Sequence, residues 1–247
     1  MFTKKYLPLV LVLLLAACNT LYQPTQLVYD DYRITAQQPK DSTMLRLLEP
    51  YSDSINKSMN AVVGFAEESL EKRQPSGTLG HFVADAMLFS ARKAFNMPLD
   101  AAFVNYGGQR ITQLPKGPVT RSTIFELMPF ENLVIVQSIK GNVLQQFLDH
   151  IALSGGWPVA GITFQIRDKK AVNVLVNGKP LDVNKTYQIV NSDYVANGGD
   201  HAAMLKDIPQ QNRGYLMRDA IFDYIKALKA EGKNITAQKE NRITHAQ

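Results

Sequence analysis

The sequence is poor in the residues that build disulfides, thiolate nucleophiles and metal sites. Among 247 residues it has one cysteine, Cys18, and four histidines. No cysteine follows Cys18, which excludes disulfides and thiolate chemistry within the part of the chain after it. The sequence also lacks a G-x-S-x-G elbow, a P-loop, a paired-cysteine site and a basic run with interleaved aromatic residues. These absences argue against serine esterases, P-loop enzymes and nucleic-acid-binding proteins.

The N-terminal residues have the pattern of a secretory signal. Lys4 and Lys5 precede an apolar run over residues 7–17, which is about half the ~20 residues that a membrane-spanning helix needs. The end of this run resembles a bacterial lipobox, in which the cysteine is acylated and becomes the new N-terminus. An ordinary signal with a chance cysteine is the alternative. We expect a signal peptide over residues 1–17, lipidation at Cys18 and, because Asn19 follows, an outer-membrane location in a bacterial cell envelope, on its periplasmic face or its surface.

Residues 18–45 are polar with little periodicity, and we predict that they tether the lipid to the folded part. Residues 46–247 have the apolar patterning of a folded domain, and this length is enough to bury one large core. The formal net charge of +5 is small and scattered, so it does not indicate a nucleic-acid partner. The Cys18 lipid is then the only membrane contact that the sequence predicts.

Helical and strand periodicities alternate along residues 46–247. Apolar residues at helical spacing predict helices over residues 79–95, 142–153 and 215–228. Short apolar or alternating runs predict strands over residues 101–104, 133–139 and 187–191, and a hairpin of residues 162–167 with 171–176. Thr120 is placed to cap the N-terminus of a further short helix. Interleaved strands and helices with a hairpin predict a mixed α/β fold.

Three loop segments carry residues suited to binding a ligand. Residues 105–110 read Asn-Tyr-Gly-Gly-Gln-Arg directly after a buried strand. Paired glycines such as Gly107 and Gly108 let the backbone turn sharply and approach a ligand closely. Residues 128–132 place Phe130 beside a proline turn. Residues 193–200 contain Tyr194, then Gly198 and Gly199, and then Asp200.

These side chains could together hold a ring that carries a sugar and a phosphate. Phe130 and Tyr194 could stack on either side of the ring, Asp200 could accept hydrogen bonds from vicinal hydroxyls, and Arg110 could bind a phosphate in a bidentate manner. Asn105 could face the phosphate or the edge of the ring. Each motif also has a purely structural interpretation, because glycine pairs, Pro-Phe and aspartate are common in ordinary turns. The residues alone predict only an α/β domain with several glycine loops.

The ordered set of motifs resembles the C-terminal domain of 5′-nucleotidases. The matching segments are Asn-Tyr-Gly-Gly-Gln-Arg at 105–110, Pro-Phe-Glu-Asn at 129–132, Lys-Gly at 140–141 and Ser-Asp-Tyr-Val-Ala-Asn-Gly-Gly-Asp at 192–200. The helix around residues 80–87 resembles that family's first helix. The order and separations of these segments are similar to the family's over roughly residues 62–243, which is nearly all of the expected folded part.

The resemblance implies a four-layer α/β/β/α domain that recognises the nucleoside part of a substrate. It implies that Phe130 and Tyr194 stack on the base, although the family usually has phenylalanine where Tyr194 stands. It further implies that Asp200 holds the ribose hydroxyls and that Arg110 contacts the phosphate, with Asn105 at or near the base. The family has another arginine before its first helix, at a spacing that falls near Pro75. This chain has Arg73 instead, two positions away, and Arg73 is our candidate for a second phosphate contact.

The resemblance does not extend to the family's metal-bearing phosphoesterase domain. That domain supplies Asp-x-His and Gly-Asn-His segments for two cations, and none of this chain's histidines lies in such a segment. His81 and Asp85 are one helical turn apart and could touch one metal, but a solvated helix face is the favoured interpretation. We therefore expect no catalytic residues, metal or cofactor in this chain, and no room for a second domain between Cys18 and residue 45.

Three functions remain compatible with the sequence. The chain could recognise the nucleotide for a 5′-nucleotidase-type hydrolase whose divalent metals belong to a separate metallophosphatase chain. It could instead be a free-standing surface lipoprotein that binds nucleosides or nucleotides without catalysis. It could also be a structural envelope domain with a decayed pocket. The intact aromatic pair and Asp200 argue against the third function, and the first is our prediction.

Overall fold

The computed structural model describes residues 26, 28–33, 35, 37–237 and 240–246. The chain divides into two units, Met1–Leu48 and Glu49–Gln247. The predicted signal peptide and Cys18 lie outside the described residues. Helix α2 (Ser42–Met59) is capped by Asp41, whose Oδ1 accepts hydrogen bonds from the N–H groups of Thr43 and Met44 at 2.8 and 3.1 Å. The predicted boundary between tether and domain falls inside α2, which has no buried residue.

The described part of the chain contains no helix that is both long and apolar enough to cross a membrane.

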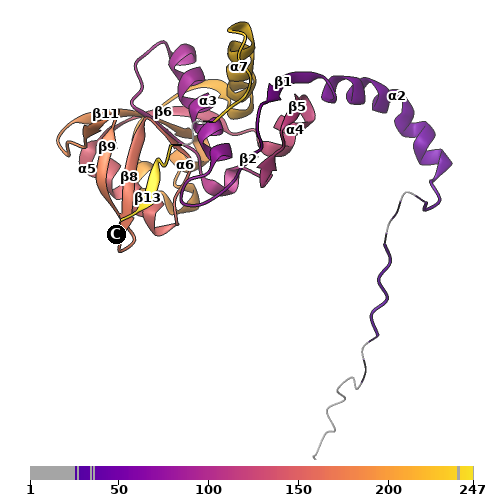
Figure 1. The fold of residues 1–247 in the computed structure, drawn as a ribbon, viewed down its shortest axis with the longest axis horizontal. Coiled ribbons are helices and arrows are strands. Elements are labelled where there is room, and N and C mark those ends of the chain that lie inside the picture. The colour runs from indigo at the N-terminus through magenta and orange to yellow at the C-terminus, as the bar shows by residue number, and fades with distance from the viewer. Residues whose placement is uncertain (1–25, 27, 34, 36, 238–239, 247) are drawn as a thin grey trace, which may run out of the picture. The chain divides into compact units, whose positions relative to one another are not determined.

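A five-stranded sheet forms the centre of the second unit (Figure 1). Its strand order is β12 (Gln210–Leu216), β6 (Leu133–Lys140), β11 (Thr186–Ser192), β3 (Ala101–Phe103) and β7 (Val159–Ala160). β11 runs parallel to β3, and the other pairs are antiparallel. Ala101 and Phe103 belong to one hydrophobic core, whereas Ala102 and Val104 belong to another. The sheet is therefore buried on both faces, which explains why β3 reads as a continuous apolar run.

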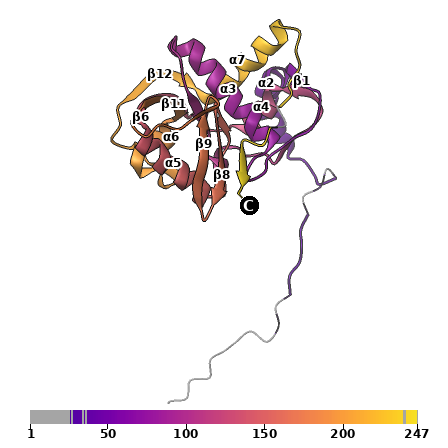
Figure 2. The same cartoon turned by 60° about the vertical axis from the view of Figure 1, so that its left-hand side comes forward.

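Three helices pack over one face of this sheet and share its first core. They are α3 (Thr78–Phe95), α4 (Arg121–Leu127) and α7 (Met217–Ala230). α3 and α7 lie against each other in both views (Figures 1 and 2). Ser90 Oγ on α3 donates a hydrogen bond to the Ala220 carbonyl on α7 at 2.7 Å. Thr120 caps α4, as the sequence predicts, and the structure adds a capping box with Thr123.

The second core joins the other face of the sheet to α5 (Gly141–Leu153) and to a four-stranded sheet. That sheet has the order β10 (Lys179–Pro180), β9 (Lys170–Val176), β8 (Ile162–Arg167) and β13 (Ile243–His245). The predicted hairpin is the β8–β9 pair. With two mixed cores of helices and strands, the predicted α/β class is confirmed.

Short elements connect these layers. Two small antiparallel pairs are β1 (Val62–Ala66) with β5 (Gly117–Thr120) and β2 (Leu70–Glu71) with β4 (Gln113–Leu114). The loops that the sequence singles out contain η1 (Tyr106–Gly108), α6 (Asp193–Ala196) and η2 (Gly199–His201), with η3 (Ala203–Leu205) after them.

One sequence prediction about secondary structure needs correction, and one strand was not predicted. The last helix begins at Met217 and not at Tyr215, because Tyr215 and Leu216 end strand β12, where Leu216 pairs with Leu133. The C-terminal tail also has more structure than its sequence pattern indicates. Its strand β13 pairs in parallel with β8, and Arg242 just before it is buried.

The interpretation of His81 and Asp85 as a solvated helix face is also wrong. His81 is 4% exposed, and its Nε2 hydrogen-bonds the Ser76 hydroxyl at 2.6 Å. Both carboxylate oxygens of Asp85 accept hydrogen bonds from the Arg242 guanidinium at 2.8 Å. These partners lie far apart in the sequence or across a turn, so helical periodicity cannot reveal them.

Candidate nucleoside-binding pocket

The topology of the five-stranded sheet brings the three candidate loops to one edge. β3 and β11 are parallel, so the loops that follow them leave the sheet at the same edge. β6 is antiparallel to β11, with Val134 opposite Ser192, so β6 begins at that edge. Residues 105–110, 128–132 and 193–200 therefore meet there, outside the carboxyl ends of two parallel strands, where α/β folds commonly bind ligands.

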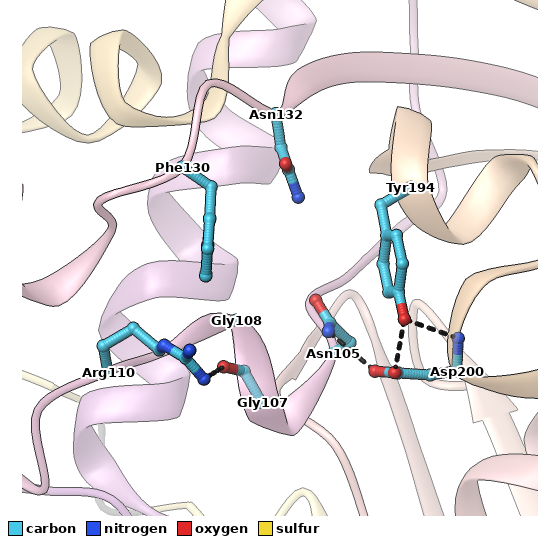
Figure 3. Close-up of a pocket in the computed structure, with 8 residues that line it drawn as sticks. All are labelled: Asn105, Gly107, Gly108, Arg110, Phe130, Asn132, Tyr194 and Asp200. Carbon is cyan, nitrogen blue, oxygen red and sulfur yellow. Dashed lines mark hydrogen bonds between the residues drawn. The ribbon is translucent and has the colours of Figure 1, made fainter.

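The three loops enclose a pocket with a volume of about 240 Å³. Figure 3 shows its lining residues, which are Asn105, Gly107, Gly108, Arg110, Phe130, Asn132, Tyr194 and Asp200. The structure thus brings together five of the six predicted binding side chains and one predicted glycine pair. Asn132 belongs to the lining as well, although the sequence analysis names it only as part of a motif. Gly198 and Gly199 are not in the lining and form the turn before Asp200.

Two aromatic rings face the pocket from opposite sides (Figure 3). Phe130 is 40% exposed and Tyr194 is 46% exposed. The Arg110 guanidinium carbon lies 5.0 Å from the centre of the Phe130 ring, within the range of a cation–π contact. A planar ligand between the rings would remove both apolar faces from water, which favours binding.

Asp200 is held by hydrogen bonds from three directions. Its carboxylate accepts a hydrogen bond from Asn105 Nδ2 at 2.7 Å and another from the Tyr194 hydroxyl at 2.8 Å. Its own N–H donates to the Tyr194 hydroxyl oxygen at 3.2 Å, and its carbonyl accepts from His150 Nε2 at 2.8 Å. Asp200 has a φ of +48°, a conformation that non-glycine residues rarely adopt. These contacts hold both the backbone and the carboxylate in place.

Two glycines leave room for the binding side chains. A Cβ on Gly108 would lie 2.7 Å from Asn105 Oδ1. A Cβ on Gly199 would lie 2.5 Å from the Tyr194 carbonyl oxygen and 2.6 Å from two atoms of its ring. At Gly107 the nearest atom would be 4.0 Å away. Glycine is therefore needed at 199, where the clash is with backbone. A Cβ at 108 would displace the Asn105 amide, and Gly107 has no such restriction.

Two charged residues outside the pocket fix the aromatic loops. Asp193 Oδ1 accepts hydrogen bonds from the N–H groups of Leu133 at 3.1 Å and Tyr194 at 2.9 Å. It thereby ties the start of β6 to the segment that carries Tyr194. Arg218 is buried at the start of α7, and its guanidinium lies 3.3 Å from the Pro129 carbonyl oxygen. Sequence reasoning missed both residues, although Asp193 lies within the motif at 192–200.

Arg73 is not among the residues that line the pocket. Its side chain is 70% exposed and forms an ion pair with Glu71. The cation beside the Arg110 loop is instead Lys72, whose Nζ donates to the Gln109 carbonyl at 2.7 Å and lies 4.2 Å from the centre of the Tyr106 ring. Burial and then the nearby charge of Arg110 lower the pKa of the Lys72 ammonium. This side of the pocket is therefore positively charged.

The described residues do not fit a dimetal centre. They include no group of three or more His, Cys, Asp or Glu side chains that could hold a metal ion. His81 and His150 have the hydrogen-bond partners given above, Ser76 and the Asp200 carbonyl.

The comparison with known protein families agrees with this geometry. Residues 56–207 match the family model described as the 5′-nucleotidase C-terminal domain. The chain belongs to this family. A 5′-nucleotidase of Vibrio cholerae is 27% identical over 204 residues, which are 78% of this chain and 36% of that protein. The trifunctional nucleotide phosphoesterase YfkN of Bacillus subtilis is 28% identical over 218 residues, which are 79% of this chain and 14% of that protein.

Solved structures show the same fold. The 5′-nucleotidase precursor of Thermus thermophilus superposes with a TM-score of 0.72 at 28% identity, over 85% of this chain and 44% of that chain. The NAD nucleotidase of Haemophilus influenzae gives a TM-score of 0.63 at 20% identity, over 84% and 42%. This 5′-nucleotidase C-terminal domain spans about a third of the 5′-nucleotidase of V. cholerae and less than half of these two solved chains.

Proposed function

We propose that this chain recognises nucleosides or nucleotides for a 5′-nucleotidase-type hydrolase whose two metal ions belong to a separate phosphoesterase chain. One observation carries the proposal, which is the pocket where Phe130 and Tyr194 face each other with Asp200 and Arg110 at its edges. The aromatic slot matches the base of a nucleotide, the carboxylate matches its sugar, and the guanidinium matches its phosphate. Family membership and relatives named as 5′-nucleotidases support the same ligand class.

Each part of the ligand has a partner in this proposal. The base stacks between Phe130 and Tyr194, which contributes about 1–3 kcal/mol per base in comparable systems. The ribose hydroxyls donate to Asp200, Asn105 lies next to them, and Arg110 binds the phosphate. The pocket's 240 Å³ is below the roughly 300–1,000 Å³ of typical ligand sites. It therefore suits one base, with the phosphate projecting outward past Arg110. Arg73 is exposed and remains a proposed contact for that projecting phosphate.

The separate phosphoesterase chain and the lipid anchor are parts of the proposal that rest on the sequence. Asp-x-His and Gly-Asn-His segments are absent from the printed sequence, and Cys18 closes a lipobox-like run. The chain is then an outer-membrane lipoprotein of a bacterial envelope that binds nucleotide by itself. It releases phosphate only when the metallophosphatase chain is added.

Thermal unfolding of the chain with adenosine, AMP and free ribose 5-phosphate tests the binding site. A ligand at a hundredfold excess over its dissociation constant stabilises the folded state by about 2.7 kcal/mol, which raises the Tm of a chain of this size by several degrees. Phe130→Ala and Tyr194→Ala should each abolish the shift with adenosine. Phe65→Ala is the matched control, because Phe65 is a similarly exposed phenylalanine, at 44%, outside the pocket. Absence of any shift with adenosine and AMP would overturn the proposal.

A further inference from the structure

The Tyr194 hydroxyl makes two hydrogen bonds to a single residue. It donates to Asp200 Oδ1 at 2.8 Å and accepts from the Asp200 N–H at 3.2 Å. A phenylalanine ring at this position could stack on a ligand equally well, so stacking does not require the hydroxyl. The hydroxyl must therefore be explained through what it does to Asp200.

The hydrogen bonds to Asp200 leave a particular set of acceptor positions open. Each carboxylate oxygen can accept about two hydrogen bonds. Within the described part of the chain, Tyr194 occupies one position on Oδ1 and Asn105 Nδ2 occupies one on Oδ2. One position on each oxygen then remains for a ligand. Two neighbouring acceptors of this kind match the two O–H donors of a vicinal diol.

The protein holds this carboxylate in a fixed orientation. The His150 ring fixes the Asp200 carbonyl, and the backbone of Asp200 has the left-handed φ of +48°. The Tyr194 ring lies directly against Gly199, where a Cβ would come within 2.6 Å of ring atoms. The hydroxyl thus extends from a ring that packs against Gly199, and it hydrogen-bonds both the backbone and the carboxylate of Asp200.

We propose that the Tyr194 hydroxyl is a specificity-determining group that orients Asp200 to bind a vicinal diol, so that the pocket prefers ribonucleosides over 2′-deoxyribonucleosides. This inference rests on the proposed function. A 2′-deoxy ligand leaves one of the two acceptors without its donor. Sites built to hydrogen-bond a hydroxyl reject analogues that lack it, because a polar group of the protein then loses its partner. Without the Tyr194 hydroxyl the carboxylate can rotate and accept water instead, so the preference falls.

The test compares the dissociation constants of adenosine and 2′-deoxyadenosine for the full chain and for Tyr194→Phe. The natural chain should prefer adenosine by roughly 10- to 100-fold, the range for one hydrogen bond to a charged group. Tyr194→Phe keeps the ring, so 2′-deoxyadenosine should bind nearly as before. Adenosine should bind more weakly, and the ratio of the two constants should fall by about threefold or more.

Tyr215→Phe is the matched control for loss of a hydroxyl. The Tyr215 hydroxyl also donates to a carboxylate, Asp223 Oδ2 at 2.6 Å, but neither residue lines the pocket. Its removal should leave the ratio unchanged. The Tm of each variant without ligand shows whether the fold is retained.

The outcomes separate this inference from the proposed function. If adenosine binds and Tyr194→Phe keeps the full preference for adenosine over 2′-deoxyadenosine, the proposed role of the hydroxyl is wrong and the proposed function stands. The same conclusion follows if the natural chain binds both nucleosides equally. If neither nucleoside binds, the inference is overturned, and if AMP does not bind either, the proposed function is overturned with it. A ratio that falls in Tyr194→Phe and not in Tyr215→Phe supports the assignment.

Discussion

At the scale of single residues, the pocket depends on side chains that would never touch a ligand. Asp193 is the main example, because one carboxylate oxygen accepts the N–H groups of Leu133 and Tyr194. Leu133 follows the segment that carries Phe130, and Tyr194 is itself the second aromatic residue. Asp193 therefore controls how the two aromatic rings are placed relative to each other.

We expect Asp193→Ala to weaken adenosine binding although Asp193 does not line the pocket. Two backbone donors lose a charged acceptor, which should reduce the free energy of unfolding by about 1–3 kcal/mol. Asp193→Asn keeps one carbonyl oxygen and should have a smaller effect on both quantities. Urea unfolding and adenosine titration measure them. Unchanged affinity in a folded Asp193→Ala variant would contradict the positioning role.

The glycines provide a second prediction at this scale. Gly199→Ala should lower the Tm and abolish nucleoside binding, because its Cβ would lie 2.5 Å from the Tyr194 carbonyl oxygen and 2.6 Å from the ring. Gly107→Ala should leave the Tm nearly unchanged, since the atom nearest to the new Cβ would be 4.0 Å away. Thermal unfolding of the two variants tests whether close packing is the reason that residue 199 is a glycine. Equal loss of stability in the two variants would mean that close packing does not explain it.

At the scale of elements, local patterns predicted strands and helices well where the buried apolar residues of an element form one uninterrupted pattern. The predicted bounds lie within one or two residues of the observed ones for the strands β3, β6 and β11 and for the helices α3 and α5. The start of α7 was misplaced because Tyr215 and Leu216 fit the helical spacing while Leu216 in fact pairs with β6. β13 was missed because three residues are too few for periodicity, and its stability comes from a distant partner, β8.

The ion pair between the buried Arg242 and Asp85 allows a test of whether the C-terminal segment contributes to the stability of the fold. Arg242 is 6% exposed and binds Asp85 on α3 through two hydrogen bonds, with a third to the Val159 carbonyl. Arg242→Ala should lower the free energy of unfolding by about 1–3 kcal/mol, because the half-buried Asp85 carboxylate and the Val159 carbonyl lose a charged hydrogen-bond donor. Lys233→Ala removes an exposed ion pair with Glu231. Such surface pairs contribute little to stability, so the free energy of unfolding should barely change. Similar losses in chemical denaturation would argue against this role of Arg242.

At the scale of the whole molecule, the sequence identified the loops of the pocket but not the reason that they meet. Composition and periodicity predicted glycine turns at 107–108 and 198–199, and the family resemblance supplied the roles of Phe130, Tyr194 and Asp200. Their convergence follows from the neighbouring positions of β6, β11 and β3 in one sheet. That order depends on contacts between residues far apart in the chain. Arg73 lies outside the pocket lining and pairs with Glu71, so its contact with a phosphate stays a prediction.

The order of these strands also sets which loops are neighbours. The loops that carry Phe130, Tyr194 and Asn105 adjoin three consecutive strands of one sheet. The backbone pairing of the sheet thus keeps the three loops together, whatever side chains they carry. Substitutions on the loops can alter which ligands are accepted while the strand order stays constant. Recognition in this domain can consequently diverge between relatives without rebuilding the scaffold.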